Sequence, residues 1–206
     1  MIPLWVKVAY SAFVALLVPL YWIAYSPWNF LYFCDIALIV TGIAIWIESP
    51  LLISMQGVAI VAPQMVWVVD LLCRLVFGVH VTGVTAYMLD ASIPLFLRGL
   101  SLYHGWLPFV LLWLLSRSGY DGRAFALQSV VSIVVLLVSY LFAPVPPPSA
   151  SHPHWAVNLN YVYGLDDAHP QTTMPPRLWV LSLMAVHVIA IYTPTHFVFR
   201  RVFARP

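Results

Sequence analysis

A few residues able to do chemistry stand in stretches that are otherwise strongly apolar. Those expected to form a polar site are Asp35, Asp70, Asp90, Arg98, His104 and His187, with Cys34 beside Asp35. An ionisable side chain costs about 2.5–3.5 kcal/mol or more at the centre of a membrane helix, so a specific pairing or a function must keep it there. The sequence leaves open whether these groups line a ligand or catalytic pocket or form a structural polar network.

The segment around His104 carries the most specific pattern. Arg98, Ser101 and His104 follow one another at intervals of three residues, which places them on one stripe of a helix. His104 could act as a general base and Arg98 could stabilise developing negative charge, with Cys34 or Ser101 as the nucleophile. Pro108 cannot bond back to the carbonyl of His104, so a kink is expected there.

The composition requires helices in lipid to position these residues. Of the 206 residues, 63% are hydrophobic and only 8% charged, whereas about a quarter of a soluble domain is charged. A membrane helix needs about 20 mostly apolar residues. The sequence therefore predicts an all-α, polytopic transmembrane bundle that forms a single domain over residues 1–206. The six predicted spans are Ile2–Ile23, Phe30–Ile47, Leu51–Leu72, Ile93–Leu115, Ala124–Leu141 and Leu178–Phe199.

The distribution of positive charge predicts the orientation. One side of a six-span bundle holds Lys7, Arg117, Arg123, Arg200, Arg201 and Arg205, and the other side holds Arg74, Arg98 and Arg177. Lysine and arginine are enriched in cytoplasmic loops, so both termini are expected in the cytoplasm and the chain in the inner membrane of a cell. The expected site then lies in the outer half. Asp35 and Arg98 lie about 8 Å below the outer ends of their spans, His104 about 16 Å and His187 about 14 Å.

The longest connection, Phe142–Arg177, is extracytoplasmic in this topology. Pro144–Pro148 should form an extended polyproline arm. The aromatic and asparagine residues of Trp155–Gly164 favour an ordered lid over the outer ends of the second, fourth and sixth spans. A flexible linker is the alternative.

Several functions find no support in the sequence. GxSxG, HExxH, P-loop and GxGxxG motifs are absent, and a net charge of +2 without a basic stripe does not indicate nucleic acid. No cofactor and no metal site are predicted, although the sequence leaves open whether His152, His154 and His169 bind a metal. The expected partners are membrane lipids and another membrane protein.

Two resemblances add to this interpretation. Ser26–Glu48, the stretch from Asp90 through His104 to Pro108, Asn158–Gly164 and Tyr192–His196 together resemble uncharacterised bacterial multi-span "membrane-associated proteins". More distantly, Asn29–Asp35 and the segment from His104 to Phe109 are similar to androgen-induced intramembrane lipid hydrolases, which pair a threonine with a histidine. Tyr32 stands where that threonine would be, and the spacing from histidine to proline differs.

Two hypotheses follow. In the first, the protein is a non-catalytic membrane component that binds a lipid or small molecule in the outer half, or serves as a subunit of a larger assembly. In the second, it is an intramembrane lipid hydrolase or acyltransferase with His104 as general base. The first is favoured, because the sequence offers no convincing pair of nucleophile and base.

Overall fold

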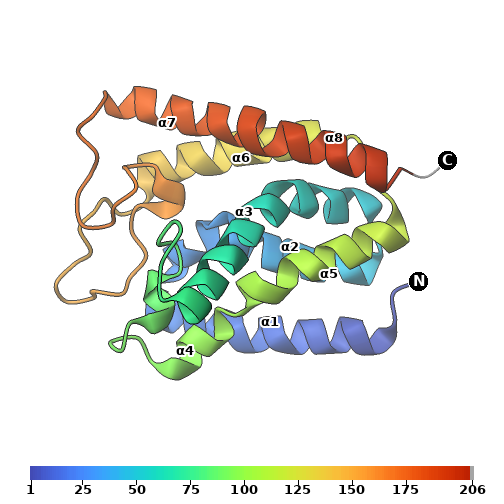
Figure 1. Ribbon diagram of the computed structural model, residues 1–206, viewed down its shortest axis with the longest axis horizontal. Coiled ribbons are helices and arrows are strands. Elements are labelled where there is room, and N and C mark those ends of the chain that lie inside the picture. Colours follow the sequence, from blue (N-terminus) through green and yellow to red (C-terminus); the bar gives the residue numbers. More distant parts are fainter. Residues whose placement is uncertain (205–206) are drawn as a thin grey trace.

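The computed structural model describes residues 1–204 as an all-α bundle whose helices run along one long axis (Figure 1). The predicted spans correspond to α1 (Leu4–Tyr25), α2 (Phe33–Ile47), α3 (Pro50–Phe77), α4 (Leu95–Leu100) with α5 (Tyr103–Ser118), α6 (Ala124–Phe142), and α7 (Pro176–Ala185) joined through the π-helical η4 (Val186–Tyr192) to α8 (Thr193–Val202). Three short 3-10 helices lie in the connections: η1 (Pro27–Leu31), η2 (Ala86–Leu89) and η3 (Leu159–Tyr161).

Five of these helical passes are long and apolar enough to cross a membrane. The sixth, α2, is apolar but has only 15 residues. It begins at Phe33, three residues later than predicted, because the preceding Pro27–Leu31 forms η1 instead. The chain is thus a multi-pass helical membrane protein by the length and composition of its helices.

The central element is α3, which packs against α2, α5, α6, η4 and α8. Every residue from Ile53 to Val61 is buried. Gly57 makes this close approach possible, since a Cβ atom there would lie 3.0 Å from both Leu115 Cδ1 and Phe199 Cε2. The absence of a side chain at Gly57 therefore determines how closely α5 and α8 approach α3.

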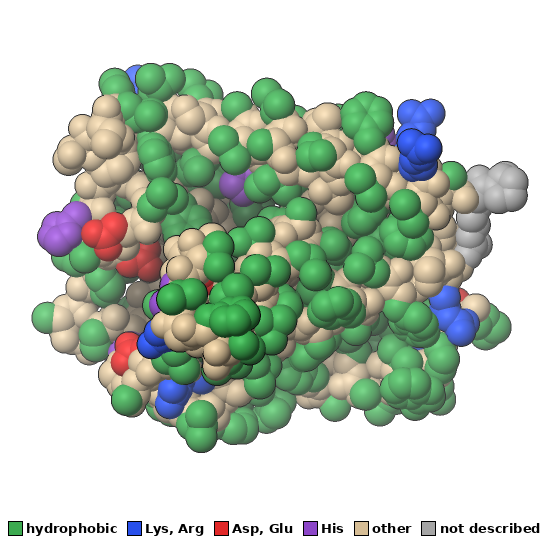
Figure 2. Space-filling view, viewed as in Figure 1, with side chains coloured by type: hydrophobic (Ala, Val, Ile, Leu, Met, Phe, Trp, Pro, Cys, Tyr) green, Lys and Arg blue, Asp and Glu red, His purple; other side chains and the backbone are tan. Residues whose placement is uncertain are grey.

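Charged side chains gather toward the two ends of the long axis, and hydrophobic side chains dominate the surface between them (Figure 2). We call one end the loop end, because it holds residues 26–32, 78–94 and 143–175. The other, the terminal end, holds the start of α1 and the end of α8 (Figure 1). There Lys7 Nζ lies 2.7 Å from Glu48 Oε1, and Tyr120 N donates to Phe203 O at 3.0 Å, so the short α2–α3 and α5–α6 turns lie at this end too.

The helix break predicted at His104–Pro108 lies earlier in the structure. The chain turns at Ser101–Leu102, between α4 and α5, and Pro108 lies inside α5. At the junction, hydrogen bonds join residues three apart in the chain, from His104 N to Ser101 O and from Gly105 N to Leu102 O. Pro108 is the sixth residue of α5, so the helix continues through it although the bond from residue 108 to the His104 carbonyl is missing.

Candidate functional site

Asp70 stabilises the loop that connects α3 to α4 through hydrogen bonds. Its side chain is fully buried, and its carboxylate accepts hydrogen bonds from the backbone N–H groups of Val81, Thr82, Gly83 and Thr85, at 2.6–3.2 Å. The Thr85 hydroxyl and the His80 ring also contact it. Arg74, one helical turn further along α3, does not pair with Asp70; its Nη1 donates to Gly78 O. The contacts of the Asp70 carboxylate are thus with residues 80–85 of this loop, which they stabilise.

Asp35 is the centre of a second polar cluster, at the start of α2. It is 3% exposed. Its Oδ1 accepts from the Tyr103 hydroxyl at 3.0 Å and its Oδ2 from Asn29 Nδ2 at 3.0 Å. The Cys34 thiol lies 3.9 Å from the same Oδ2. Because neutral donors satisfy this carboxylate, it needs no cation.

His104 lies beside the Asp35 cluster without joining it through its ring. Its Nδ1 contacts the Ser101 carbonyl at 2.8 Å, and the ring stacks on Trp67 at 5.3 Å between centroids. The Ser101 hydroxyl faces Tyr21 instead, at 2.6 Å. Neither candidate nucleophile, Cys34 or Ser101, makes a side-chain hydrogen bond to His104 within residues 1–204.

Arg98 lies apart from both carboxylate clusters. Its Nη1 donates to the carbonyl of Met88 at 3.1 Å, and its Nε is buried without a hydrogen-bond partner. Across the described chain no carboxylate oxygen lies within 4.0 Å of it. Hydrogen bonds from Ser92 are the main reason that the pKa of Asp90 is lowered. The positive charge of Arg98 makes a smaller contribution, as does His154.

His187 occupies a different place, on η4. Its Nδ1 contacts Leu183 O at 2.8 Å, and its ring packs on Phe33 at 5.1 Å between centroids. The predicted polar residues therefore divide among several sites: the Asp70 loop, the Asp35 cluster with His104 nearby, the Arg98–Asp90 region, and His187.

The long loop between α6 and α7 is ordered by its asparagines. Asn158 and Asn160 both adopt positive φ, at 48° and 55°, which asparagine tolerates better than most residues. Asn160 Oδ1 accepts from Phe33 N at 3.1 Å and so caps α2, while its Nδ2 donates to Leu31 O at 2.9 Å. Asn158 Nδ2 donates to Gly164 O at 2.9 Å and closes the loop on itself.

The segment Trp155–Gly164 packs at the loop end as expected, and its neighbours match the prediction in part. Ala156 N donates to Tyr25 O at 2.9 Å, and Trp179 Nε1 to Tyr161 O at 2.8 Å. The Tyr163 hydroxyl donates to Tyr140 O at 2.7 Å. The contacts thus reach α2 and α7, which belong to the predicted second and sixth spans, and also α1 and α6, whereas none of these bonds reaches the predicted fourth span.

His152 and His169 of the long loop contact different partners. His152 stacks on Trp155 at 3.9 Å between centroids, and His169 Nδ1 lies 3.5 Å from Asp166 Oδ2. Over residues 1–204, no group of three or more His, Cys, Asp or Glu side chains could hold a metal ion.

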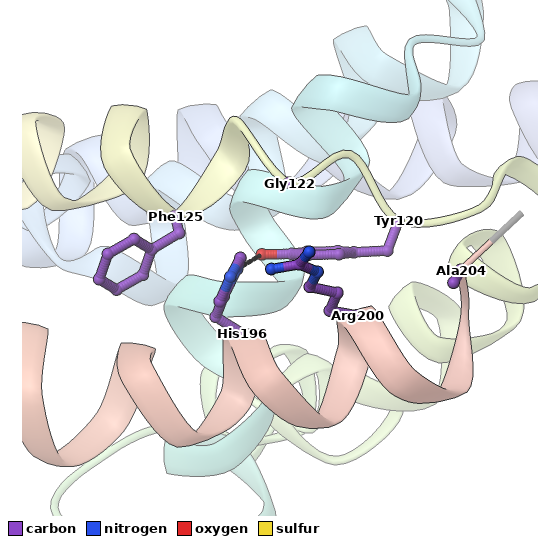
Figure 3. Close-up of a pocket in the computed structure, with 6 residues that line it drawn as sticks. All are labelled: Tyr120, Gly122, Phe125, His196, Arg200 and Ala204. Atoms are coloured by element: carbon purple, nitrogen blue, oxygen red, sulfur yellow. Dashed lines mark hydrogen bonds between the residues drawn. The ribbon is translucent and has the colours of Figure 1, made fainter.

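A cleft of about 470 Å³ lies at the terminal end, away from all of these residues (Figure 3). Its lining is Tyr120, Gly122, Phe125, His196, Arg200 and Ala204. The Tyr120 hydroxyl and His196 Nδ1 are 2.7 Å apart. His196 and Arg200 rise from the same side of α8 toward Tyr120.

Sequence reasoning missed this cleft, although part of its pattern was visible. His196 and Arg200 are four residues apart and so share a helix face. Nothing in the sequence indicated that the turn holding Tyr120 would meet that face, because the backbone bond from Tyr120 N to Phe203 O joins residues far apart in the chain.

The chain was compared with protein-family models, with curated proteins and with solved structures, and none of the three comparisons found a match.

Proposed function

We propose that this chain is an inner-membrane protein, of bacterial type, that crosses the bilayer six times with both termini in the cytoplasm. The start of α1 and the end of α8 lie at one end of the bundle (Figure 1), as an even number of crossings requires. The described residues at that end include Lys7, Arg117, Arg123, Arg200 and Arg201, whereas Arg74, Arg98 and Arg177 belong to the loop end. Arg205, counted with the first group on the sequence, lies outside the described residues. This asymmetry supports a cytoplasmic terminal end.

Within that topology, the protein acts as a non-catalytic component that binds a lipid or small amphiphile at the loop end. The observation that carries this proposal is the environment of Arg98: its Nε is buried without a hydrogen-bond partner, and no carboxylate oxygen of the described residues lies within 4.0 Å of its guanidinium. A buried donor without a partner costs free energy, so an oxygen-bearing ligand would stabilise it.

The surroundings of Arg98 fit an amphiphile. Leu95 and Phe96, on the same short helix, are 75% and 57% exposed. A cation beside exposed apolar side chains, near the end of the membrane-spanning region, can bind an anionic or carbonyl headgroup while the apolar groups contact the chain of the ligand. Asp35 and Asp70 do not compete for Arg98, because other donors already satisfy them.

The experiment is native mass spectrometry of the protein purified in mild detergent, with Arg98→Gln compared with Arg177→Gln. Both substitutions remove one positive charge from the loop end, and Arg177 is exposed. We expect the wild type and Arg177→Gln to carry the same bound lipid or small molecule, and Arg98→Gln to lose most of it. Equal occupancy in all three proteins would remove the support for this site.

A further inference from the structure

The terminal-end cleft combines a cation, a hydroxyl and an imidazole in a hollow large enough for a small headgroup. Its volume of about 470 Å³ falls within the usual range of ligand sites, about 300–1,000 Å³. A second hollow, of about 360 Å³, adjoins it across Tyr120 and Gly122. None of the residues that line these two hollows belongs to the proposed site at Arg98.

Arg200 supplies the positive charge of the cleft. Within residues 1–204 no carboxylate oxygen lies within 4.0 Å of its guanidinium. The one acidic residue in the neighbouring turn, Asp121, is held by Arg123, whose Nη2 lies 2.7 Å from Asp121 Oδ2. Among residues 1–204 no acidic group therefore competes for the guanidinium of Arg200, and its fork of N–H donors matches two oxygens of one anion.

The pair of Tyr120 and His196 adds a neutral donor. If the Tyr120 hydroxyl donates to Nδ1, the imidazole carries its proton on Nε2; if Nδ1–H donates, the tyrosine proton is free. Either arrangement leaves one donor on the pair. Burial, with a smaller effect of the Asp121 charge, raises the pKa of Tyr120 to about 12, so the phenol stays neutral at physiological pH.

The apolar surroundings of the cleft indicate which kind of molecule carries the anionic group. Phe125 forms one wall of the cleft. Phe197 of α8 is 61% exposed, and its ring lies 5.4 Å from that of His196 between centroids. Arg200 lies in the last turn of a helix that belongs to a candidate membrane span, at the level where headgroups meet the hydrocarbon core. The donors thus stand next to a surface suited to acyl chains.

We propose that the cleft lined by Tyr120, His196 and Arg200 binds the phosphate of an anionic lipid headgroup. Arg200 engages two phosphate oxygens and the Tyr120–His196 pair donates to a third. The acyl chains pass along Phe125 and Phe197. This proposal does not depend on which end of the bundle faces the cytoplasm.

The test is a titration of the purified full-length protein, in detergent, followed by native mass spectrometry. The probes are dioleoyl phosphatidylglycerol, dioleoylglycerol, which lacks the phosphate, and free glycerol 3-phosphate, which lacks the chains. We expect phosphatidylglycerol to bind with an affinity that Arg200→Gln lowers about tenfold, the usual effect of losing a charged hydrogen bond. Tyr120→Phe, which keeps the ring and removes the hydroxyl, should weaken binding several-fold.

Arg201→Gln is the matched control. It removes the same charge from the next residue, which is not part of the cleft lining, and should bind phosphatidylglycerol as the wild type does. Equal losses in the two arginine variants would show general attraction by positive charge and overturn the site. Binding of dioleoylglycerol as tight as that of phosphatidylglycerol would overturn the role of the phosphate, and tight binding of glycerol 3-phosphate alone would overturn the lipid as its source. Arg98→Gln should leave this titration unchanged, so the two proposals can fail separately.

Discussion

Asp70 shows how a single buried carboxylate can organise a loop without a lysine or arginine partner. Four backbone N–H groups between Val81 and Thr85 point at its two oxygens. Hydrogen bonds to a charged acceptor contribute about 1.5–3 kcal/mol each, more than neutral ones. The connection from α3 to α4 therefore has a fixed conformation although it contains little regular structure.

Replacing Asp70 by Asn should loosen this loop and leave the helices in place. An amide presents one oxygen and one N–H₂ group, so several backbone donors lose their acceptor. We expect the amides of Val81, Thr82 and Gly83 to exchange hydrogen about tenfold faster or more. Exchange measured by mass spectrometry checks this, with Asp90→Asn as control because Asp90 is exposed and bonds mainly to Ser92. Unchanged exchange in Asp70→Asn would show that other contacts hold the loop.

The sequence identified these polar residues as costly and could not supply their partners. Arg74 stands one helical turn from Asp70 in the sequence, yet the hydrogen-bond donors to Asp70 come from residues 80–85. Asp35 likewise bonds to Tyr103, which is 68 residues away. Periodicity relates residues on one helix, whereas these contacts depend on how separate segments meet in space.

At the scale of elements, α2 depends on the long loop for its start. Tyr32, its N-cap residue, provides no side-chain cap, and Asn160 Oδ1 accepts the Phe33 N–H instead. A capping interaction of this kind contributes about 1 kcal/mol. The loop and the helix should therefore lose order together.

Asn160→Ala tests that dependence. Removing the amide eliminates the bonds to Phe33 N and Leu31 O, so Trp155–Gly164 should become cleavable by an external protease, and thermal stability should fall by about 1–2 kcal/mol. His154→Ala is the control, since His154 is an exposed residue of the same loop. Resistance to cleavage equal to that of the wild type would mean that the remaining loop contacts suffice.

Sequence patterns located most helices well and their interruptions less well. The end predicted at Ile47 and the start predicted at Ala124 agree with α2 and α6, because apolar stretches end at polar turns. The break between α4 and α5 was expected at His104–Pro108 and lies at Ser101–Leu102. Ser101, at this break, bonds to Tyr21 of another helix, a contact that local sequence rules do not predict.

At the scale of the whole molecule, the proposed topology predicts which surfaces meet the outside of the cell. In a variant without Cys34 and Cys73, Ser149→Cys should react with a membrane-impermeant maleimide in intact cells. Arg201→Cys should react only after the membrane is opened. Both positions are exposed at opposite ends of the bundle, so accessibility depends on the membrane alone. The reverse pattern would place the terminal end outside and invert the orientation.

The length of α2 has a consequence for the surrounding bilayer. At 1.5 Å per residue its 15 residues span about 22 Å, roughly 8 Å less than a hydrocarbon core of about 30 Å. The half of α2 nearer the terminal end exposes Ile43, Trp46 and Ile47. At the loop end, the polar backbone of η1 and the Asn160 side chain extend as far as Phe33, the first residue of α2. Thinning of the lipid next to α2 is one way to accommodate this short helix, whereas α3, with 28 residues, is longer than the hydrocarbon core is thick. Such uneven matching around one perimeter favours residence in thinner membranes, or a neighbouring protein that covers the short side.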